Sequence, residues 1–457
     1  MQVPEEQAAH NSNTDHPAVA AFQRAAATVP GYRQMLAERR VDPAGVSTLD
    51  AFLRITPVTD KQQLFGRFPL PELCADRKLD DIIAAYTSSG YTGTFSFGVE
   101  TLADVQRATS HIDRMFVHFT GADRRRTLLI NALPAGVRVP CSVAITMDIG
   151  PRADAAVGAV RSLGACVDQI AFSAEQPMLK LIAETGRLAG VEWNKHRIFA
   201  VTGAELMAEN FRSYVGGIFG HDPERPEAGR IVLSVGISEV SLSLGLESNG
   251  LYRLRRAMHA DVALRRALLG EDRFVPALVM YDPREFFLET PVLEGGLPRL
   301  VVTTLAEDRR IPLIRYATGD WARVIWPDEL AGKLHAAGRD NLLSPDMAAP
   351  VLVLWGRGRG VHVGQRTVFP EQVKESLYSL PGLAGCLTGN FRMEPEAGRL
   401  KLRVQLKKGE PGPAGEAAEL GRRIEAETGV PAGVSLVVYE EMPEGMELSY
   451  QKKFGYV

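Results

Sequence analysis

The sequence has few cysteines, and their spacing fits no metal site or disulfide framework. Only four occur among 457 residues, at Cys74, Cys141, Cys166 and Cys386. Structural zinc sites and disulfide-rich domains need closely paired or regularly spaced cysteines, and the chain contains no CxxC pair. The spacing therefore excludes both classes and favours reduced, mostly buried thiols in a cytoplasmic protein.

Long apolar runs and an excess of one charge are also missing. No stretch approaches the roughly 20 apolar residues of a membrane helix, and the segment MQVPEEQAAHNSNTDHP lacks the apolar core of a signal peptide. The net charge of −3 creates no global basic field, which argues against nucleic acid as a partner. These absences predict a cytoplasmic protein that binds neither a membrane nor nucleic acid.

The length and the hydrophobic content of 45% are instead those of a globular protein with more than one core. From Arg126 to Val240, strand-like runs such as TLLINAL, RIFAVTG and RIVLSVG alternate with amphipathic helical runs such as AAVGAVRSLG and MLKLIAETGRLAG. Strands separated by such helices predict βαβ units with a parallel sheet. The fold class is therefore α/β.

Two later regions change character. Residues 274–326 contain the short extended runs FVPALVMYD, RLVVTTL, PLIRYA and ARVIW, which predict a smaller β-rich subdomain. The glycine-rich segment GRGRGVHVG then predicts either an ordinary turn or a hinge. The helix- and strand-like runs after it predict an α+β module of about 100 residues. We therefore expect an N-terminal domain over residues 1–355 and a mobile C-terminal domain over 356–457.

The first candidate site motif is TSSGYTGTFS, which follows the strand-like run DDIIAAY and spans residues 87–96. Clustered glycines and hydroxyls allow backbone N–H and side-chain O–H groups to converge on phosphate oxygens. The motif differs from the GxxxxGK[ST] loop of P-loop NTPases. A plain turn explains it about as well when it is considered alone.

The second motif is PLIRYATGD, over residues 312–320, with VTTL just upstream. A carboxylate at a strand end beside a glycine can accept hydrogen bonds from both hydroxyls of a ribose. By itself this pattern is equally typical of an ordinary turn that ends a strand.

In their order along the chain, these motifs resemble those of the phenylacetate–CoA ligase branch of the adenylate-forming superfamily. TSSGYTGT stands at the family's phosphate loop, and PLIRYATGD is nearly identical to its PLIRYRTGD. Further matches are Gly203-Ala204-Glu205, the SVGISE stretch that ends at Glu239, Gly356-Arg357, VFPEQV and Lys452. The resemblance covers nearly the whole chain.

The resemblance implies a role for each matched residue. Lys452, Glu239 and Thr92 would be catalytic, and Glu239 would also hold Mg²⁺. The nucleotide would bind to Ser88, Ser89, Gly90, Gly93, Gly203, Ala204, Glu205, Val235, Gly236, Ser238, Asp320 and Arg357. The acid pocket would be lined by Asn131, Ala204, Gly236 and Ile237. Lys453 is adjacent to Lys452, so the choice between these two lysines rests on register alone.

The implied reaction uses ATP, Mg²⁺ and a thiol, either coenzyme A or the phosphopantetheine of a carrier protein. A carboxylate that attacks the α-phosphate of ATP brings two anions together, and a metal with a lysine ammonium would offset that repulsion. The predicted partners are a small carboxylic acid, aromatic by resemblance, and an acyl carrier protein as the second option for the acceptor. A homodimer is compatible with the same resemblance.

The chain also departs from the family pattern. Thr94-Phe95 replaces the Lys-Pro of the phosphate loop, and Val235 replaces an aromatic residue that packs against adenine. Two alternatives to a ligase therefore stay open: a ligase-derived acyltransferase that uses preformed acyl donors, and a non-catalytic binding or scaffold protein. Retention of Glu239, Asp320, Arg357 and Lys452 favours the ligase.

Overall fold

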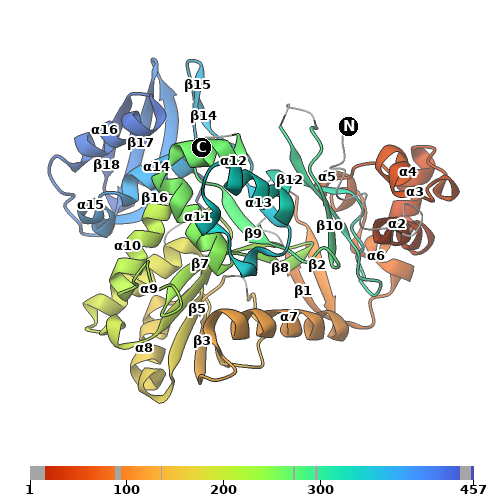
Figure 1. The fold of residues 1–457 in the computed structure, drawn as a ribbon, viewed down its shortest axis with the longest axis horizontal. Helices are drawn as coiled ribbons and strands as arrows, with labels where there is room; N and C mark the ends of the chain where they lie inside the picture. The colour runs from red at the N-terminus through yellow and green to blue at the C-terminus, as the bar shows by residue number, and fades with distance from the viewer. Residues whose placement is uncertain (1–15, 88–93, 135, 271–272, 294–296, 443–453) are drawn as a thin grey trace.

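The computed structural model describes residues 16–87, 94–134, 136–270, 273–293, 297–442 and 454–457. They form a large lobe built around one long sheet and a smaller C-terminal lobe, drawn in blue in Figure 1. Both parts mix helices and strands, so the α/β prediction is confirmed.

Short helices at the N-terminus pack against one end of the large lobe (Figure 1). They are α2 (Pro17–Thr28), α3 (Pro30–Glu38), α4 (Leu49–Ile55), α5 (Lys61–Leu64) and α6 (Leu70–Leu73). Pro30 ends the first helical pattern as expected, and it also opens the next helix, where its missing N–H costs no hydrogen bond. Arg315 fixes this cluster by donating to the carbonyls of Leu53 and Thr56, each at 2.7 Å.

The predicted βαβ region forms the parallel half of an 11-stranded sheet. Its strands, in spatial order, are β4 (Ile145–Asp148), β3 (Thr127–Asn131), β5 (Gln169–Ser173), β6 (Ile198–Thr202) and β7 (Arg230–Ile237). The connecting helices are α8 (Ala153–Leu163), α9 (Gln176–Leu188) and α10 (Glu209–Phe219). The strands β3 and β5 are buried along their whole length, which explains their continuous apolar sequences.

The β-rich part continues the same sheet through antiparallel pairing of β7 with β8. Its strands are β8 (Ser241–Leu246), β9 (Ala277–Met280), β13 (Val351–Leu354), β12 (Tyr316–Ile325), β11 (Arg299–Thr304) and β10 (Phe286–Glu289). The runs PLIRYA and ARVIW were expected as two strands, and this detail is wrong. A single strand, β12, begins at Tyr316, and its two halves pair with different neighbours, β11 and β13.

Further elements cover the sheet and flank its edge. They are α7 (Leu102–Thr120), α11 (Asn249–Ala260), α12 (Val262–Leu269), α13 (Pro327–Ala336) and the hairpin of β1 (Ile82–Thr87) with β2 (Phe97–Thr101). Helix α7 begins with a capping box between Thr101 and Asp104 and ends at Gly121, which is left-handed at φ 68°.

The C-terminal lobe is an α+β module, as predicted. It contains β14 (Val361–Val363), β15 (Arg366–Val368), α14 (Pro370–Tyr378), α15 (Pro381–Cys386), β16 (Leu387–Glu396), β17 (Arg399–Leu406), α16 (Glu416–Thr428) and β18 (Ala432–Val437). The run LAGCLTGNF was expected as one strand, but α15 occupies its first residues because Pro381 opens a helical turn there. The domain boundary at residue 356 and the mobility of this lobe stay predictions.

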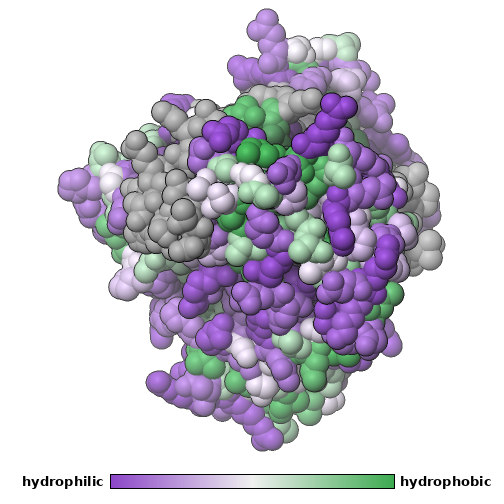
Figure 2. Space-filling view, turned by 90° about the vertical axis from the view of Figure 1, so that its right-hand side faces the viewer, coloured by the Kyte–Doolittle hydropathy of each residue, from purple (hydrophilic) through white to green (hydrophobic). Residues whose placement is uncertain are grey.

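Hydrophobic residues on the face that carries the N-terminal helices lie in small groups among hydrophilic ones (Figure 2). Within the described ranges, none of the helices combines the length and the apolar character that a bilayer-spanning segment needs.

Candidate functional site

The parallel half of the sheet brings most of the predicted site residues to one edge. The carboxyl ends of β3, β5, β6 and β7 meet there, because these strands run in the same direction. Strand β7 is parallel to β6 and antiparallel to β8, so the parallel half of the sheet ends at β7. In open α/β sheets, ligands bind in the crevice outside the carboxyl ends of the parallel strands. The site is therefore expected at this edge.

Glu239 lies in the turn after β7, where three hydroxyl groups hold its carboxylate. Its Oε1 accepts from the Tyr316 hydroxyl at 2.6 Å. Its Oε2 accepts from Ser96 Oγ at 3.1 Å and from Ser238 Oγ at 3.0 Å. Burial and the Glu239 charge raise the pKa of Tyr316, so the phenol stays protonated and remains a donor. A carboxylate has about four acceptor positions, so Glu239 keeps capacity for a further partner.

A close backbone contact fixes the β1–β2 hairpin against this carboxylate. A Cβ built on Gly98 of β2 would lie 2.2 Å from the carbonyl oxygen of Ser238, so only glycine fits. Ser96, two residues earlier, is fully buried. The predicted phosphate loop connects these two strands. Its residues Ser88, Ser89, Gly90, Thr92 and Gly93 lie outside the described part of the chain.

The donor set is compatible with magnesium only if the nucleotide supplies further ligands. No group of three or more His, Cys, Asp or Glu side chains that could hold a metal occurs within the described ranges. Magnesium commonly binds to one or two carboxylates together with substrate phosphates and waters. Glu239, with its remaining acceptor capacity, fits that mode.

The predicted Gly203-Ala204-Glu205 motif is a tight turn at the carboxyl end of β6. A Cβ on Gly203 would lie 2.7 Å from the carbonyl oxygen of Ser234 on β7. Ala204 has a φ of 68°, a left-handed conformation that costs a residue with a Cβ about 1 kcal/mol or more. Gln176 supports the turn by donating to the Glu205 carbonyl at 2.9 Å.

The Glu205 side chain points to the C-terminal lobe. Its Oε2 accepts from Lys374 Nζ of α14 at 2.6 Å and from the Tyr456 hydroxyl at 3.0 Å. The sequence analysis predicted a nucleotide-binding role for Glu205, and that role stays a prediction. The contact with two residues of the C-terminal lobe was not expected.

Asp320 and Arg357 are brought together by the pairing of β12 with β13. Trp321 and Trp355 bond through their backbones and stack with ring centroids 4.8 Å apart. This register places Arg357 Nε 3.9 Å from Asp320 Oδ1. Thr318 Oγ1 donates to Asp320 Oδ2 at 2.9 Å, which orients the carboxylate predicted to bind ribose.

The remaining predicted residues at β7 line the same edge. Val235 pairs with Gly245 and Ile237 with Ser241, and both Val235 and Ile237 are half-buried. Gly236 between them is exposed. These positions are suited to contact a ligand, and their roles toward nucleotide and acid stay predictions.

Asn131, predicted to line the acid pocket, lies at the carboxyl end of β3 and is buried. Its Nδ2 donates to the Val137 carbonyl at 2.7 Å and to Asp148 Oδ1 at 2.8 Å. Its Oδ1 accepts from the Leu133 N–H at 3.2 Å. The amide therefore holds the loop after β3 and the neighbouring β4, and its predicted contact with the acid remains untested.

Lys61 is a cation of the site that the sequence analysis did not single out. It begins α5, and its neighbour Thr59 forms a parallel bridge with Tyr316, the residue that donates to Glu239. Burial lowers the pKa of Lys61, the Glu239 charge raises it, and the Arg357 charge lowers it. The Lys61 ammonium therefore lies within electrostatic range of Glu239 and of Arg357. Lys61 lies in the run ITPVTDKQQLF, outside the motifs that predicted the site.

Lys452 and Lys453 lie outside the described part of the chain, so their position relative to Glu239 stays a prediction. The nearest described residues that follow them are Phe454 to Val457. Figure 1 shows the C-terminus where the blue lobe meets the large lobe, in agreement with the contact between Tyr456 and Glu205.

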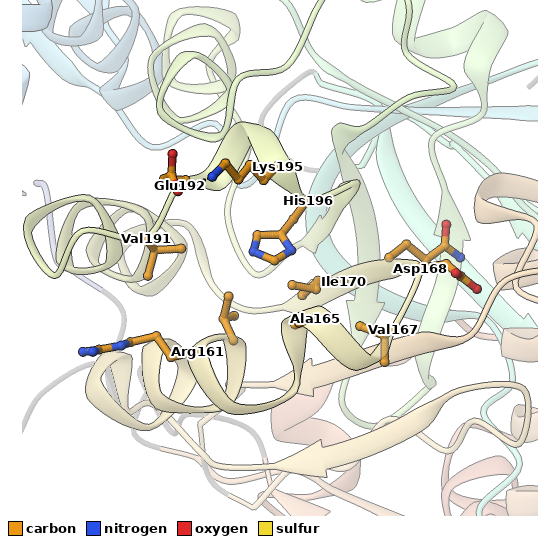
Figure 3. A pocket seen from close by; sticks show the side chains of 12 residues that line it. Arg161, Ala165, Val167, Asp168, Ile170, Val191, Glu192, Lys195 and His196 are labelled. Carbon is orange, nitrogen blue, oxygen red and sulfur yellow. Dashed lines mark hydrogen bonds and ion pairs between the residues drawn. The ribbon is translucent and has the colours of Figure 1, made fainter.

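A separate hollow of about 490 Å³ lies at the opposite edge of the sheet, between α8 and the segment before β6 (Figure 3). His196 stands in its centre, and Arg161 and Lys195 lie toward its rim. It is formed at the amino ends of β5 and β6 and contains none of the predicted site residues. Its location argues against a role in the predicted chemistry.

Comparison with known proteins gives the fold and a sequence relative. No protein-family model matches the chain. The chain is 25% identical over 392 residues to phenylacetate-coenzyme A ligase of Thermus thermophilus. The aligned part covers 83% of this chain and 77% of the relative. A crystal structure of 2-hydroxyisobutyryl-CoA ligase in the postadenylation state, with 2-HIB-AMP, matches with a TM-score of 0.66 at 15% identity and covers 92% of this chain and 85% of the ligase.

Crystals of the same ligase in the thioesterification state match with a lower TM-score of 0.51, at 16% identity over 93% of this chain and 88% of the ligase. The chain therefore has the fold of 2-hydroxyisobutyryl-CoA ligase. In sequence, it is similar to phenylacetate-coenzyme A ligase.

Proposed function

We propose that the protein activates a carboxylic acid with ATP to an acyl-adenylate and then transfers the acyl group to the thiol of coenzyme A. The observation that carries this proposal is the carboxylate of Glu239, held by three hydroxyls in the turn after β7. Asp320 lies further along β12, the strand whose Tyr316 donates to Glu239, and Arg357 follows β13 and lies 3.9 Å from the Asp320 carboxylate. The name of the sequence relative, phenylacetate-coenzyme A ligase, agrees with this reaction.

Each part of the edge has a distinct task in this reaction. Asp320 accepts hydrogen bonds from the ribose hydroxyls, and the phosphate loop around Thr92 orients the phosphates. Tyr316, which donates to Glu239, and Asp320 both lie on β12, so one strand carries the Glu239 contact and the proposed ribose position.

Charge neutralisation completes the scheme. Glu239 would hold Mg²⁺, which supplies positive charge to the phosphate oxygens when it is bound. Lys61 is positioned to compensate for the missing lysine of the phosphate loop, where Thr94 and Phe95 now stand. Lys452 adds an ammonium at the α-phosphate, which is commonly worth about 3–4 kcal/mol to such a transition state.

The proposal also names the class of the carboxylic acid and the thiol that accepts the acyl group. The acid is aromatic or a small biosynthetic acid, in line with the acids in the names of the relatives. Coenzyme A is the preferred acceptor, and a carrier protein is the second option. A cytoplasmic location would supply both ATP and coenzyme A, and the proposal does not depend on whether the chain forms a homodimer.

Exchange of labelled pyrophosphate into ATP, dependent on an added carboxylic acid, tests the proposal. A panel that begins with phenylacetate should show exchange, and Lys452→Ala should slow it by roughly two to three orders of magnitude. Lys453→Ala is the matched control and should retain it. Acyl transfer without exchange would instead indicate the acyltransferase, and absence of nucleotide binding would indicate the scaffold protein. The activities named for the relatives favour the ligase over both.

A further inference from the structure

The carboxylate of Glu205 joins the active-site turn to the last residues of the chain. It accepts a hydrogen bond from the Tyr456 hydroxyl at 3.0 Å and a charge-assisted one from Lys374 Nζ at 2.6 Å. The side chains of Lys374 and Glu205 are only 6% and 15% exposed, so solvent screens this ion pair weakly. The contact links β6 of the large lobe to α14 and the tail of the C-terminal lobe.

Tyr456 is held from several sides. Its ring stacks on Phe391 of β16 with centroids 4.3 Å apart, and Phe454 meets it edge-on at 6.1 Å. The Met393 N–H donates to its carbonyl at 2.8 Å, and Lys374 Nζ stands 4.5 Å from its ring centroid. Burial and the Glu205 charge raise its pKa, so the hydroxyl remains a donor. The residue is therefore a rigid anchor for the tail.

The anchor restricts the position of the predicted catalytic lysine. Lys452 is four residues before Tyr456, and four extended residues span at most about 14 Å. Tyr456 is bonded to the turn that follows β6, at the same edge of the sheet as Glu239. The residues of this contact therefore belong to the same edge as Glu239, and the position of Lys452 itself lies outside the described residues.

We propose that Tyr456 and Glu205, braced by Lys374, form a tail latch that positions the C-terminal lobe for adenylation. The inference rests on the proposed function, and it makes Tyr456 and Glu205 positioning residues. The contact should be broken when the lobe turns to admit the thiol. The higher likeness to the postadenylation crystal than to the thioesterification crystal of 2-hydroxyisobutyryl-CoA ligase, with TM-scores of 0.66 and 0.51, agrees with this assignment.

The latch should affect the two half-reactions differently. Tyr456→Phe removes the hydroxyl and keeps the stack on Phe391. We expect the maximal rate of phenylacetate-dependent pyrophosphate exchange to fall about tenfold or more, with the KM for ATP within about twofold. Thioester formation from prepared phenylacetyl-adenylate and coenzyme A should stay within about twofold of the wild type or become faster. A purely structural defect would lower both half-reactions together.

Two further variants sharpen the test. Tyr32→Phe is the matched control, because the buried Tyr32 hydroxyl has no hydrogen-bond partner in the described part of the chain. It should leave both half-reactions unchanged. Lys374→Met should slow exchange as well, and its combination with Tyr456→Phe should cost less than the two changes added together, because both donors share one carboxylate.

Unchanged exchange in Tyr456→Phe, or an equal loss in both half-reactions, would overturn the latch while the ligase proposal stands. A wild-type protein that shows no exchange with phenylacetate or any acid of the panel would overturn the proposed function and the latch with it.

Discussion

At the scale of single residues, the candidate edge depends on a few positions that tolerate only one kind of side chain. Gly98 and Gly203 each allow a backbone to approach within a distance that a Cβ would prevent. Arg315 has a φ of 45° and forms a bidentate pair with Glu289 at 2.8 and 3.1 Å. These residues lie in or beside the quoted motifs, so part of the motif identity is explained by packing and not by contact with ligand.

The turn after β6 offers a matched pair of substitutions at adjacent positions. Gly203→Ala should destabilise the protein and abolish exchange, because its Cβ would lie 2.7 Å from the Ser234 carbonyl oxygen. Ala204→Gly should keep the fold and be neutral or up to about 1 kcal/mol more stable, because glycine adopts the left-handed conformation without strain. Urea denaturation measures both, and equal effects of the two changes would refute the strained-turn assignment.

Lys61 provides a second prediction at this scale. Its ammonium lies within electrostatic range of Glu239 and Arg357, while the phosphate loop lacks the usual lysine. Lys61→Met should slow pyrophosphate exchange by about tenfold to a hundredfold through weaker stabilisation of the phosphates. Lys195→Met, which alters an exposed lysine far from this edge, should have no effect. A rate for Lys61→Met equal to that of the wild type would remove this residue from the site.

At the scale of elements, helix α14, which attaches the C-terminal lobe to the large lobe, carries two carboxylates with opposite environments. Glu375 accepts from the N–H groups of Glu209 and Asn210 at 2.7 and 2.9 Å, which caps α10. Burial would raise the pKa of Glu375, but the hydrogen bonds from His259 and from these amides hold it below its usual value. Burial raises the pKa of Glu371 to about 6.

The contrast predicts different outcomes for two substitutions on the same helix. Glu375→Gln should lower the free energy of unfolding by about 1–3 kcal/mol, because the amide loses the charge that favours the amino end of α10. Glu371→Gln should be neutral or stabilising at pH 8, where the partly buried wild-type carboxylate is charged. Urea titrations of both variants at pH 8 test this. A larger loss for Glu371→Gln than for Glu375→Gln would contradict the assignment.

At the scale of the whole molecule, one continuous sheet joins the parallel and antiparallel halves of the large lobe. The C-terminal lobe contacts the large lobe through several buried polar side chains. One of these side chains is Lys180, whose Nζ donates to the Leu387 carbonyl at 2.7 Å and pairs with Glu184 at 2.8 Å. Burial lowers the pKa of Lys180 to about 8. Buried ionisable groups of this kind make the stability of the folded protein depend on pH.

His221 should dominate one part of that dependence. It is partly buried, with Nε2 3.0 Å from the Ile198 carbonyl oxygen, and burial lowers its pKa to about 4 from an ordinary value of 6.5. The unfolded chain therefore binds one more proton between these values, so stability rises with pH across this window and is lost as pH falls through it. The shift corresponds to about 3 kcal/mol.

His221→Gln keeps a donor near the Ile198 carbonyl and removes the titration. The free energy of unfolding should then change by about 3 kcal/mol less between pH 6.5 and pH 4 than in the wild type. His335→Gln, which changes a histidine whose side chain is 81% exposed, serves as the control. Denaturation curves at several pH values measure the difference, and parallel pH profiles for His221→Gln and the wild type would contradict this role.

The sequence by itself determined the α/β class, the βαβ order and the positions of the motifs, because these depend on local periodicity and on residues adjacent in the chain. The strand runs TLLINAL and RIFAVTG illustrate this, since β3 and β6 lie within them. Local periodicity could not predict that β12 is a single strand, because its two halves pair with different strands, β11 and β13.

Only the tertiary structure decided which side chains meet. Tyr316 and Ser96 reach Glu239 from positions 77 and 143 residues away, and Tyr456 reaches Glu205 across 251 residues. Such contacts arise from the packing of sheet, hairpin and lobe, and no local pattern encodes them in one sequence. The motifs therefore indicated where the chemistry lies, while the fold selected the hydroxyls that hold the carboxylate and the tyrosine that anchors the tail.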